Sequence, residues 1–285
     1  MNLSPITAND LDELRKLQPE GWPDIIPETE FYIRSSFCFP LKAQTEHCIA
    51  GMGAAIIYEN TAWLAHIIVH PDFRNRGIGI HIVNELLQIV EFKQIQSCLL
   101  IATELGRPVY TKAGFRPVTE YVFMISENSM PPGSFSTNVI SYTRKFREQL
   151  LQMDKLITGE NREPLLSLYM DESLLYVSDD ALHGYYIPAL KEGPVIANTQ
   201  EAGLELMKIK CTASQRVVLP ADNLVAIDFL GKNGFVQSST QGTRMIRGSD
   251  IAWQPGNIYS RIGGEFRMML PLPLLPQQQW QRQWQ

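Results

Sequence analysis

The chain has 285 residues, 45% of them hydrophobic and 19% charged, with a formal net charge of -5, a composition typical of a globular protein with room for two domains of ordinary size. Acidic and basic residues are interspersed and no apolar run is long enough for a membrane helix, so neither nucleic acid nor a membrane is expected as a partner. The four cysteines lack Cys-x-x-Cys spacing and no secretory signal pattern follows Met1, so we expect reduced thiols, a cytoplasmic location and no metal site.

Apolar periodicity in the first 125 residues predicts two helices, then strands, a long helix, and a further strand, short helix and strand. Asn9 is expected to cap the first helix and Pro27 to begin the second. The strands are expected at residues 48–58, 62–69, 97–102 and 118–125, the long helix up to about residue 92, and the short helix over 105–113. The Pro- and Ser-rich residues 126–137 are interpreted as a linker.

A glycine-rich turn joins a predicted strand to the long helix, and residues 67–80 read I-I-V-H-P-D-F-R-N-R-G-I-G-I. Gly77 and Gly79 allow a backbone to approach a ligand closely, and the first amides of the following helix have no partner within it. A helix N-terminus carries partial positive charge, to which Arg74 and Arg76 add full charges. The turn is therefore predicted to bind an anionic group such as a pyrophosphate.

Two other phosphate-binding motifs do not fit this turn. A dinucleotide fold needs a third glycine where the chain has Ile82, and an acidic residue about 20 positions on, where residues 98–101 are wholly apolar. A nucleotide-triphosphate loop would need Gly-Lys-Ser/Thr, which is absent from the turn.

The turn resembles motif A of the GNAT superfamily, the GCN5-related N-acetyltransferases, whose pattern Arg/Gln-x-x-Gly-x-Gly/Ala is Arg74, Gly77 and Gly79 here. The preceding strand, His70-Pro71 and the apolar helix stand in the family's order. The resemblance implies acetyl-CoA, or another acyl-CoA, as co-substrate. It places the pyrophosphate at Arg74, Asn75, Arg76, Gly77, Ile78, Gly79 and Ile80. It also implies that the backbone amide of Val69 or of Ile68 polarises the thioester carbonyl, and that Thr103, where the family often has asparagine, hydrogen-bonds to the pantetheine.

Acyl transfer to an amine needs a neutral nucleophile, a polarised carbonyl and a proton for the departing thiolate. Tyr110 stands four residues before a Gly-Phe pair, where many GNAT enzymes place a general acid, and is the catalytic candidate. The sequence does not name the base. His66 is one candidate, although a buried structural histidine is the commoner case.

Three residues near the expected acceptor side have two readings each. Trp22 stands where the family often places acceptor-pocket residues, but it could equally pack on the sheet. Glu28 and Glu30 could attract a cationic amine or lie on a solvated helix face. His70 is expected to hydrogen-bond locally.

The C-terminal half repeats the N-terminal half faintly. Residues 110–115, Y-T-K-A-G-F, align with residues 230–235, L-G-K-N-G-F. The remainder resembles C-terminal domains of tandem GNAT proteins at Met153-Asp154, Gly159, Arg162, Asn223, Ala226 and residues 243–248. Where motif A should fall, residues 192–198 carry neither arginines nor Gly-x-Gly, so one acyl-CoA per chain is expected. The predicted fold class is α/β (α+β): a catalytic GNAT domain over 1–128 and a degenerate one over 136–285, each with a mixed, mostly antiparallel sheet flanked by helices.

The resemblance implies an N-acetyltransferase that transfers the acetyl group directly to a small-molecule amine in a ternary complex. A non-catalytic acyl-CoA sensor and an interaction scaffold remain alternatives. The sequence indicates neither the oligomeric state nor the role of the Gln- and Trp-rich residues 277–285.

Overall fold

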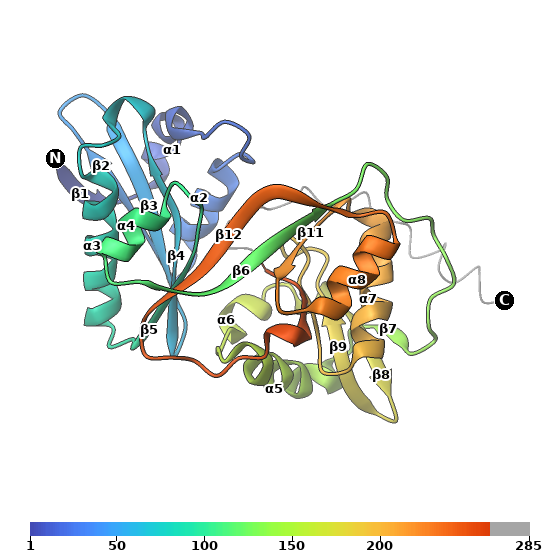
Figure 1. Ribbon diagram of the computed structural model, residues 1–285. Coiled ribbons are helices and arrows are strands. Elements are labelled where there is room, and N and C mark those ends of the chain that lie inside the picture. The colour runs from blue at the N-terminus through green and yellow to red at the C-terminus, as the bar shows by residue number, and fades with distance from the viewer. Residues whose placement is uncertain (263–285) are drawn as a thin grey trace.

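The computed structural model describes residues 1–262, in which helices and strands form two sheets (Figure 1). The N-terminal half, residues 1–125, contains β1 (Asn2–Pro5), α1 (Leu11–Leu14), α2 (Ile26–Arg34), β2 (Cys38–Gln44), β3 (Ile49–Ile57), β4 (Thr61–Val69), α3 (Ile78–Phe92), β5 (Ser97–Ala102), α4 (Arg107–Lys112) and β6 (Arg116–Ile125). The C-terminal half, residues 139–262, contains β7 (Val139–Ser141), α5 (Arg147–Thr158), α6 (Glu163–Leu166), β8 (Leu174–Ser178), β9 (Ala181–Tyr186), β10 (Val195–Ala197), α7 (Gln200–Ala213), β11 (Arg216–Pro220), α8 (Leu224–Lys232), β12 (Val236–Gly248) and β13 (Ile258–Ser260).

The larger sheet has eight strands in the order β1-β2-β3-β4-β5-β12-β6-β11. Only β4 and β5 pair in parallel, and the other neighbours are antiparallel. One face packs against α3, whose buried residues include Ile82 and Leu86. The other face packs against α1 and α2 through residues such as Leu14 and Ile26. Layers of helix on both faces of a mixed sheet confirm the predicted fold class.

Strand β12 comes from the C-terminal half but lies between β5 and β6 of the N-terminal half (Figure 1). It pairs with all of β5, from Thr243 opposite Ala102 to Gly248 opposite Ser97. Strand β6 in turn pairs with β11 of the C-terminal half. The division into domains 1–128 and 136–285 stays a prediction, and the larger sheet runs across it.

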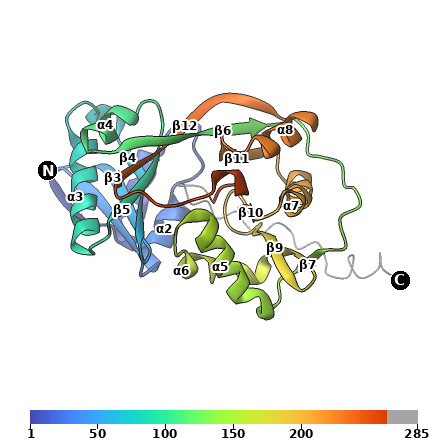
Figure 2. The same ribbon diagram turned by 60° about the horizontal axis from the view of Figure 1, so that its bottom comes forward.

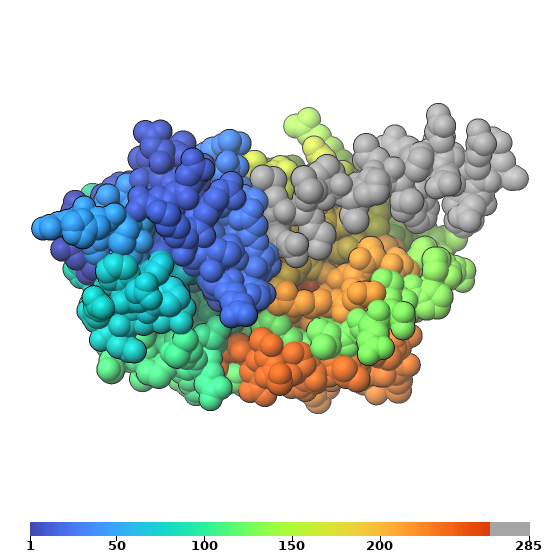
Figure 3. Space-filling view, turned by 90° about the horizontal axis from the view of Figure 1, so that it is seen from above, coloured from blue at the N-terminus to red at the C-terminus, as the bar shows by residue number. Residues whose placement is uncertain are grey.

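The smaller sheet has the order β13-β10-β9-β8-β7. The two halves also share a hydrophobic core, in which Tyr32 of α2 packs with Phe146 and Leu150 of the C-terminal half. Figure 2 shows α2 on the side of the larger sheet that faces α5 and α6. In the space-filling view the two halves lie side by side and in contact (Figure 3).

Two local predictions in the N-terminal half were wrong. The first helical turn is capped by Thr7, not Asn9, because the Asp10 carboxylate accepts hydrogen bonds from the backbone N–H and hydroxyl of Thr7. Strand β2 was missed; it contains Pro40, a residue type rarely found in an inner strand. The missing N–H of Pro40 lies beyond the end of β1, and its carbonyl accepts from Ile6 N at 3.0 Å, so the proline removes no ladder bond.

Candidate active site

The loop between β4 and α3 presents a run of free backbone donors. Gly77 is the N-cap of α3 and has φ of 79°, and it has no side chain that could occupy the first amides of the helix. Asn75 also has positive φ, at 61°. The His81 N–H donates to the Gly77 carbonyl at 3.1 Å, and the amides of residues 75–80 before it donate to no described residue. Successive amides in such turns form an anion-binding concavity. The space is open, since a Cβ on Gly79 would meet only Val69 Cγ2, at 3.6 Å, and one on Gly77 nothing within 4 Å.

Two exposed arginines flank this loop. Arg74 Nε donates to the Val69 carbonyl at 3.2 Å, which holds the side chain against the end of β4. The Arg76 guanidinium lies 5.4 Å from the centroid of the Phe73 ring. Neither arginine pairs with a carboxylate of a described residue within 4.0 Å. The donor set therefore fits a pyrophosphate group.

Strands β4 and β5 part immediately beside the loop. They pair only from Thr61 opposite Ser97 to Trp63 opposite Leu99, although β4 continues to Val69. Beyond Trp63 the polar main-chain groups of β4 on this side face a gap. The His70 N–H donates to Ala50 O of β3, and main-chain directions alternate along a strand, so Val69 faces the gap and Ile68 faces β3. Of the two predicted amides, Val69 is the one placed to meet a ligand in the gap.

A β-bulge at His66 explains why side-chain alternation could not settle that choice. The pairing of β3 with β4 shifts register between Met52 and Ala54, and His66 has φ of 50°, in the left-handed region. The bulge puts the side chains of Ala65 and His66 on the same face of the sheet, toward α2. No local sequence signal marks it, because a glycine would be expected at positive φ.

His66 is buried in an aromatic pocket and is 6% exposed. Its Nδ1 lies 2.8 Å from the Tyr32 hydroxyl, and Trp22 packs edge-on against its ring, with centroids 6.2 Å apart. Burial, and to a lesser extent the charge of Lys191, lower the pKa of His66 to about 3. A general base is most effective with a pKa near the working pH, so this histidine fits the structural role better than the catalytic one.

The titration of His66 should appear in the acid stability of the protein. The unfolded chain binds a proton at this histidine near its ordinary pKa of 6.5, but the folded chain does so only near pH 3. The free energy of unfolding should therefore fall as pH drops from about 6.5 to about 3. His66→Asn, which tolerates the positive φ, should remove this part of the decline in urea unfolding. At pH 8 His66 is neutral in both states, so the difference between variant and wild type there measures packing alone; an unchanged acid slope would contradict the prediction.

Tyr110 lies on α4, on the same side of the sheet as α3. Its ring packs edge-on to Phe115, with centroids 6.2 Å apart, and covers Gly106, where a Cβ would lie 3.0 Å from Tyr110 Cε2. The hydroxyl makes no hydrogen bond to a described residue, and burial raises the pKa of Tyr110 to about 12. The nearby Thr103 hydroxyl accepts from Gly106 N at 3.2 Å and keeps its own proton available for donation.

The structure also bears on His70 and Glu28. His70 bonds locally, as predicted, because its Nδ1 accepts from Asp72 N at 3.3 Å. Glu28 is 3% exposed, so it does not lie on a solvated helix face. Residues 277–285 lie outside the described part of the chain.

The helix that corresponds to α3 in the C-terminal half begins differently. The Thr199 hydroxyl caps α7 by accepting from Ala202 N at 3.3 Å, and Glu201 adds negative charge in the first turn. Both features disfavour an anion there. Titration calorimetry with acetyl-CoA should therefore return one site per chain. A stoichiometry of two would show that the C-terminal half binds CoA by another route.

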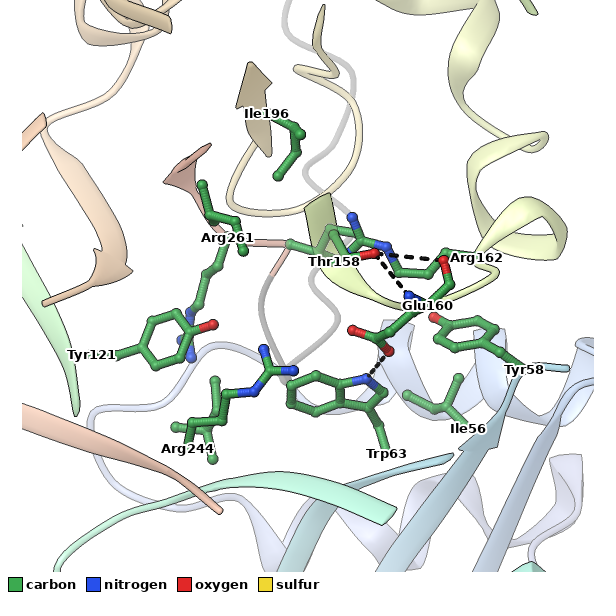
Figure 4. A pocket seen from close by; sticks show the side chains of 13 residues that line it. Ile56, Tyr58, Trp63, Tyr121, Thr158, Glu160, Arg162, Ile196, Arg244 and Arg261 are labelled. Atoms are coloured by element: carbon green, nitrogen blue, oxygen red, sulfur yellow. Dashed lines mark hydrogen bonds between the residues drawn. The ribbon is translucent and has the colours of Figure 1, made fainter. Parts of the chain in front are cut away.

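A cavity between the two halves was not foreseen from the sequence (Figure 4). It lies on the face of the larger sheet opposite α3, because Trp63 packs with the core on that face. It is lined by Trp63 of β4, Ile101 of β5, Glu160 after α5 and Arg244 of β12. Gly159 and Arg162 were singled out in the sequence, but Glu160 between them was not. Arg244 lay in the noted run 243–248. Only the insertion of β12 brings these side chains together, and no sequence spacing reports that insertion.

The free amides of residues 75–80, with Arg74 and Arg76, form a cradle for an anionic group beside the point where β4 and β5 part. Residues 8–115 match the family model of the acetyltransferase (GNAT) family. This part of the chain belongs to the GNAT family. A comparison with curated protein sequences gives no match.

Solved structures resemble the whole chain. A protein from Pyrococcus horikoshii classed as an acetyltransferase is 19% identical, with a TM-score of 0.78 over 93% of this chain and 95% of its own. A GCN5-related N-acetyltransferase from Sphaerobacter thermophilus is 13% identical, with a TM-score of 0.58 over 87% of this chain and 95% of its own. One from Anabaena variabilis is 14% identical, with a TM-score of 0.54 over 86% of this chain and 72% of its own. At these identities the likeness establishes a shared fold across both halves.

None of the helices within residues 1–262 combines the length and apolar character needed to cross a membrane.

Proposed function

We propose that the protein is an acetyl-CoA-dependent N-acetyltransferase that transfers the acetyl group directly to the amine of a small molecule in a ternary complex. The observation that carries the proposal is the run of unpartnered amides at residues 75–80 beside the gap between β4 and β5. Such a run suits the pyrophosphate of CoA. The main-chain groups of Val69, turned toward the gap, suit the pantetheine and thioester.

The residues of the gap can divide the chemistry between them. Acetyl-CoA, when bound, supplies the acetyl group as an activated thioester. The Val69 amide would donate a hydrogen bond to the carbonyl oxygen, where negative charge develops. Tyr110 would give its phenolic proton to the sulfur as the carbon–sulfur bond breaks.

The proton balance assigns Tyr110 a single proton in each turnover. The acceptor ammonium loses one proton before its nitrogen bonds to the carbonyl carbon, and a second as the amide forms. One proton leaves to solvent, and the other restores Tyr110. The C-terminal half would shape the acceptor side of this site. The four free cysteines suit a reducing, cytoplasmic location.

The test is release of free thiol from acetyl-CoA in the presence of a panel of small primary amines. Wild type is run beside Gly79→Leu, which fills the cradle. Amine-dependent release in wild type alone would support the transferase. Acetyl-CoA binding without turnover of any amine would fit a non-catalytic sensor instead. If Gly79→Leu loses acetyl-CoA binding but still performs the function of the wild-type protein in the cell, the protein would be an interaction scaffold instead.

A further inference from the structure

The cavity between the two halves lies where β4 and β5 separate. Trp63 is the last residue of β4 that pairs with β5, and Ile101 lies two residues beyond its partner Leu99. Both side chains line the cavity. A group held in the gap by Val69 and its neighbours is therefore approached from this side of the sheet, opposite α3 (Figure 4).

Arg244 enters this cavity from β12 and is 3% exposed. Its guanidinium lies 4.0 Å from the centroid of the Trp253 ring and 5.1 Å from that of Trp63. Its Nε and Nη2 make no hydrogen bond to any described residue. These two atoms form one edge of the guanidinium, the edge that binds a carboxylate through two parallel hydrogen bonds.

Glu160 enters the same cavity from the turn after α5 and is 1% exposed. One of its oxygens accepts from the Trp63 indole N–H at 2.5 Å and from the Thr61 hydroxyl at 3.1 Å. No cationic side chain of the described residues lies within ion-pair distance of it. A buried carboxylate and a buried guanidinium thus stand at the same indole without being paired with each other (Figure 4).

The other charges around the cavity are already neutralised. Arg162 binds Asp154 through two nitrogens, and the Tyr185 hydroxyl also donates to Asp154. Arg261 binds Glu192 at 3.0 and 3.2 Å. The Arg162–Asp154 pair fixes the turn that presents Glu160. In that turn Gly159 has φ of 75°, and a Cβ there would lie 2.3 Å from Ala252 O.

Leaving one cation and one anion buried and unpaired is costly for folding, so each needs a compensating partner in the functional state. An acceptor of any N-acetyltransferase brings an amine, and Glu160 suits its ammonium form. Arg244 then calls for an anionic group on the same molecule. Carboxylate matches the free two-donor edge and, together with the ammonium, makes the ligand a zwitterion that balances both charges.

We propose that the acceptor is an amine that also carries a carboxylate, an amino acid in the broad sense, with its carboxylate on Arg244 and its ammonium on Glu160. This inference rests on the proposed function, because it names the substrate class of the same site. Nε and Nη2 are closed off from water, so the ligand reaches them after a rotation of the guanidinium or of an indole.

The experiment measures thiol release from acetyl-CoA with the twenty standard L-amino acids, each paired with its carboxamide. The carboxylate members should be preferred, by about 100-fold in kcat/KM for the best pair, because the amide is uncharged and offers Arg244 only one acceptor oxygen. Arg244→Met should lose this preference, and Arg244→Lys should keep only part of it. Arg247→Met is the matched control, since Arg247 lies on β12 but binds Glu91 at 2.9 Å, away from the cavity; it should keep the preference.

Thermal unfolding without ligand separates a binding role from a structural one. Arg244→Met should unfold at the same temperature as wild type or above it, because an unpaired buried charge is removed. A clear fall in that temperature, with the substrate preference retained, would make Arg244 a packing residue and overturn the inference.

The outcomes also separate this inference from the proposed function. Equal or faster turnover of the carboxamides would overturn the carboxylate assignment and leave the transferase intact. Binding of acetyl-CoA with no turnover of either set or of other amines would overturn both.

Discussion

Replacing Gly79 by leucine is expected to abolish acetyl-CoA binding while leaving the fold intact. A Cβ at this position meets only Val69 Cγ2 at 3.6 Å, so the new side chain occupies open space over the amides at the start of α3. That space is where the pyrophosphate would lie. Wild type at 100 times its dissociation constant should gain about 2.7 kcal/mol in the free energy of unfolding, and the variant should gain none. Thermal unfolding with and without acetyl-CoA measures both.

Gly77→Ala is the contrasting control for this prediction. Gly77 has φ of 79°, so alanine there is strained by about 1–2 kcal/mol although nothing lies within 4 Å of its Cβ. It should lower the stability of the free protein, whereas Gly79→Leu should not. An acetyl-CoA shift of wild-type size in Gly79→Leu would show that the pyrophosphate does not sit at this helix.

The second large effect is expected at Tyr110. Tyr110→Phe should lower kcat by about 10²–10⁴-fold, the usual contribution of a positioned acid, with acetyl-CoA affinity unchanged. Phenylalanine keeps the edge-on packing against Phe115 and the cover over Gly106, so the loss would report the proton alone. Single-turnover rates beside binding titrations measure the two quantities.

The pH dependence gives a further check on the same residue. Burial disfavours the phenolate and raises the pKa of Tyr110 to about 12, so the acid stays protonated at pH values well below that. The rate should show no alkaline decline due to Tyr110 up to about pH 10. Full activity of Tyr110→Phe would exclude it as the acid and leave the departing sulfur to take its proton from water.

The cradle could be predicted from sequence because all its parts lie within one short stretch. Gly77 has a φ that favours glycine, Gly79 leaves open space beside the first amides of α3, and Arg74 follows the strand at a fixed spacing. Each requirement is local, so residue types report it directly.

The bulge at His66 and the cavity between the two halves could not be predicted, because their geometry depends on long-range pairing. His66 occupies a bulge without the glycine that would mark it. Glu160 and Arg244 meet only after β12 has entered the sheet of the other half. Strand β2 holds Pro40 without losing a ladder bond, because the neighbouring strand β1 has ended there, and that depends on the pairing and not on the local sequence.

The insertion of β12 also constrains the order of events during synthesis. When residues 1–128 have emerged from the ribosome, β5 and β6 are both available. The strand that lies between them, β12, is complete only after residue 248 has been added. Until then both strands offer unpaired edges, a state prone to aggregation and to wrong pairings. The nascent N-terminal half must therefore wait, partly open, for most of the chain. A fragment that ends at residue 128 would keep residues 75–80 but lack the strand that lies between β5 and β6.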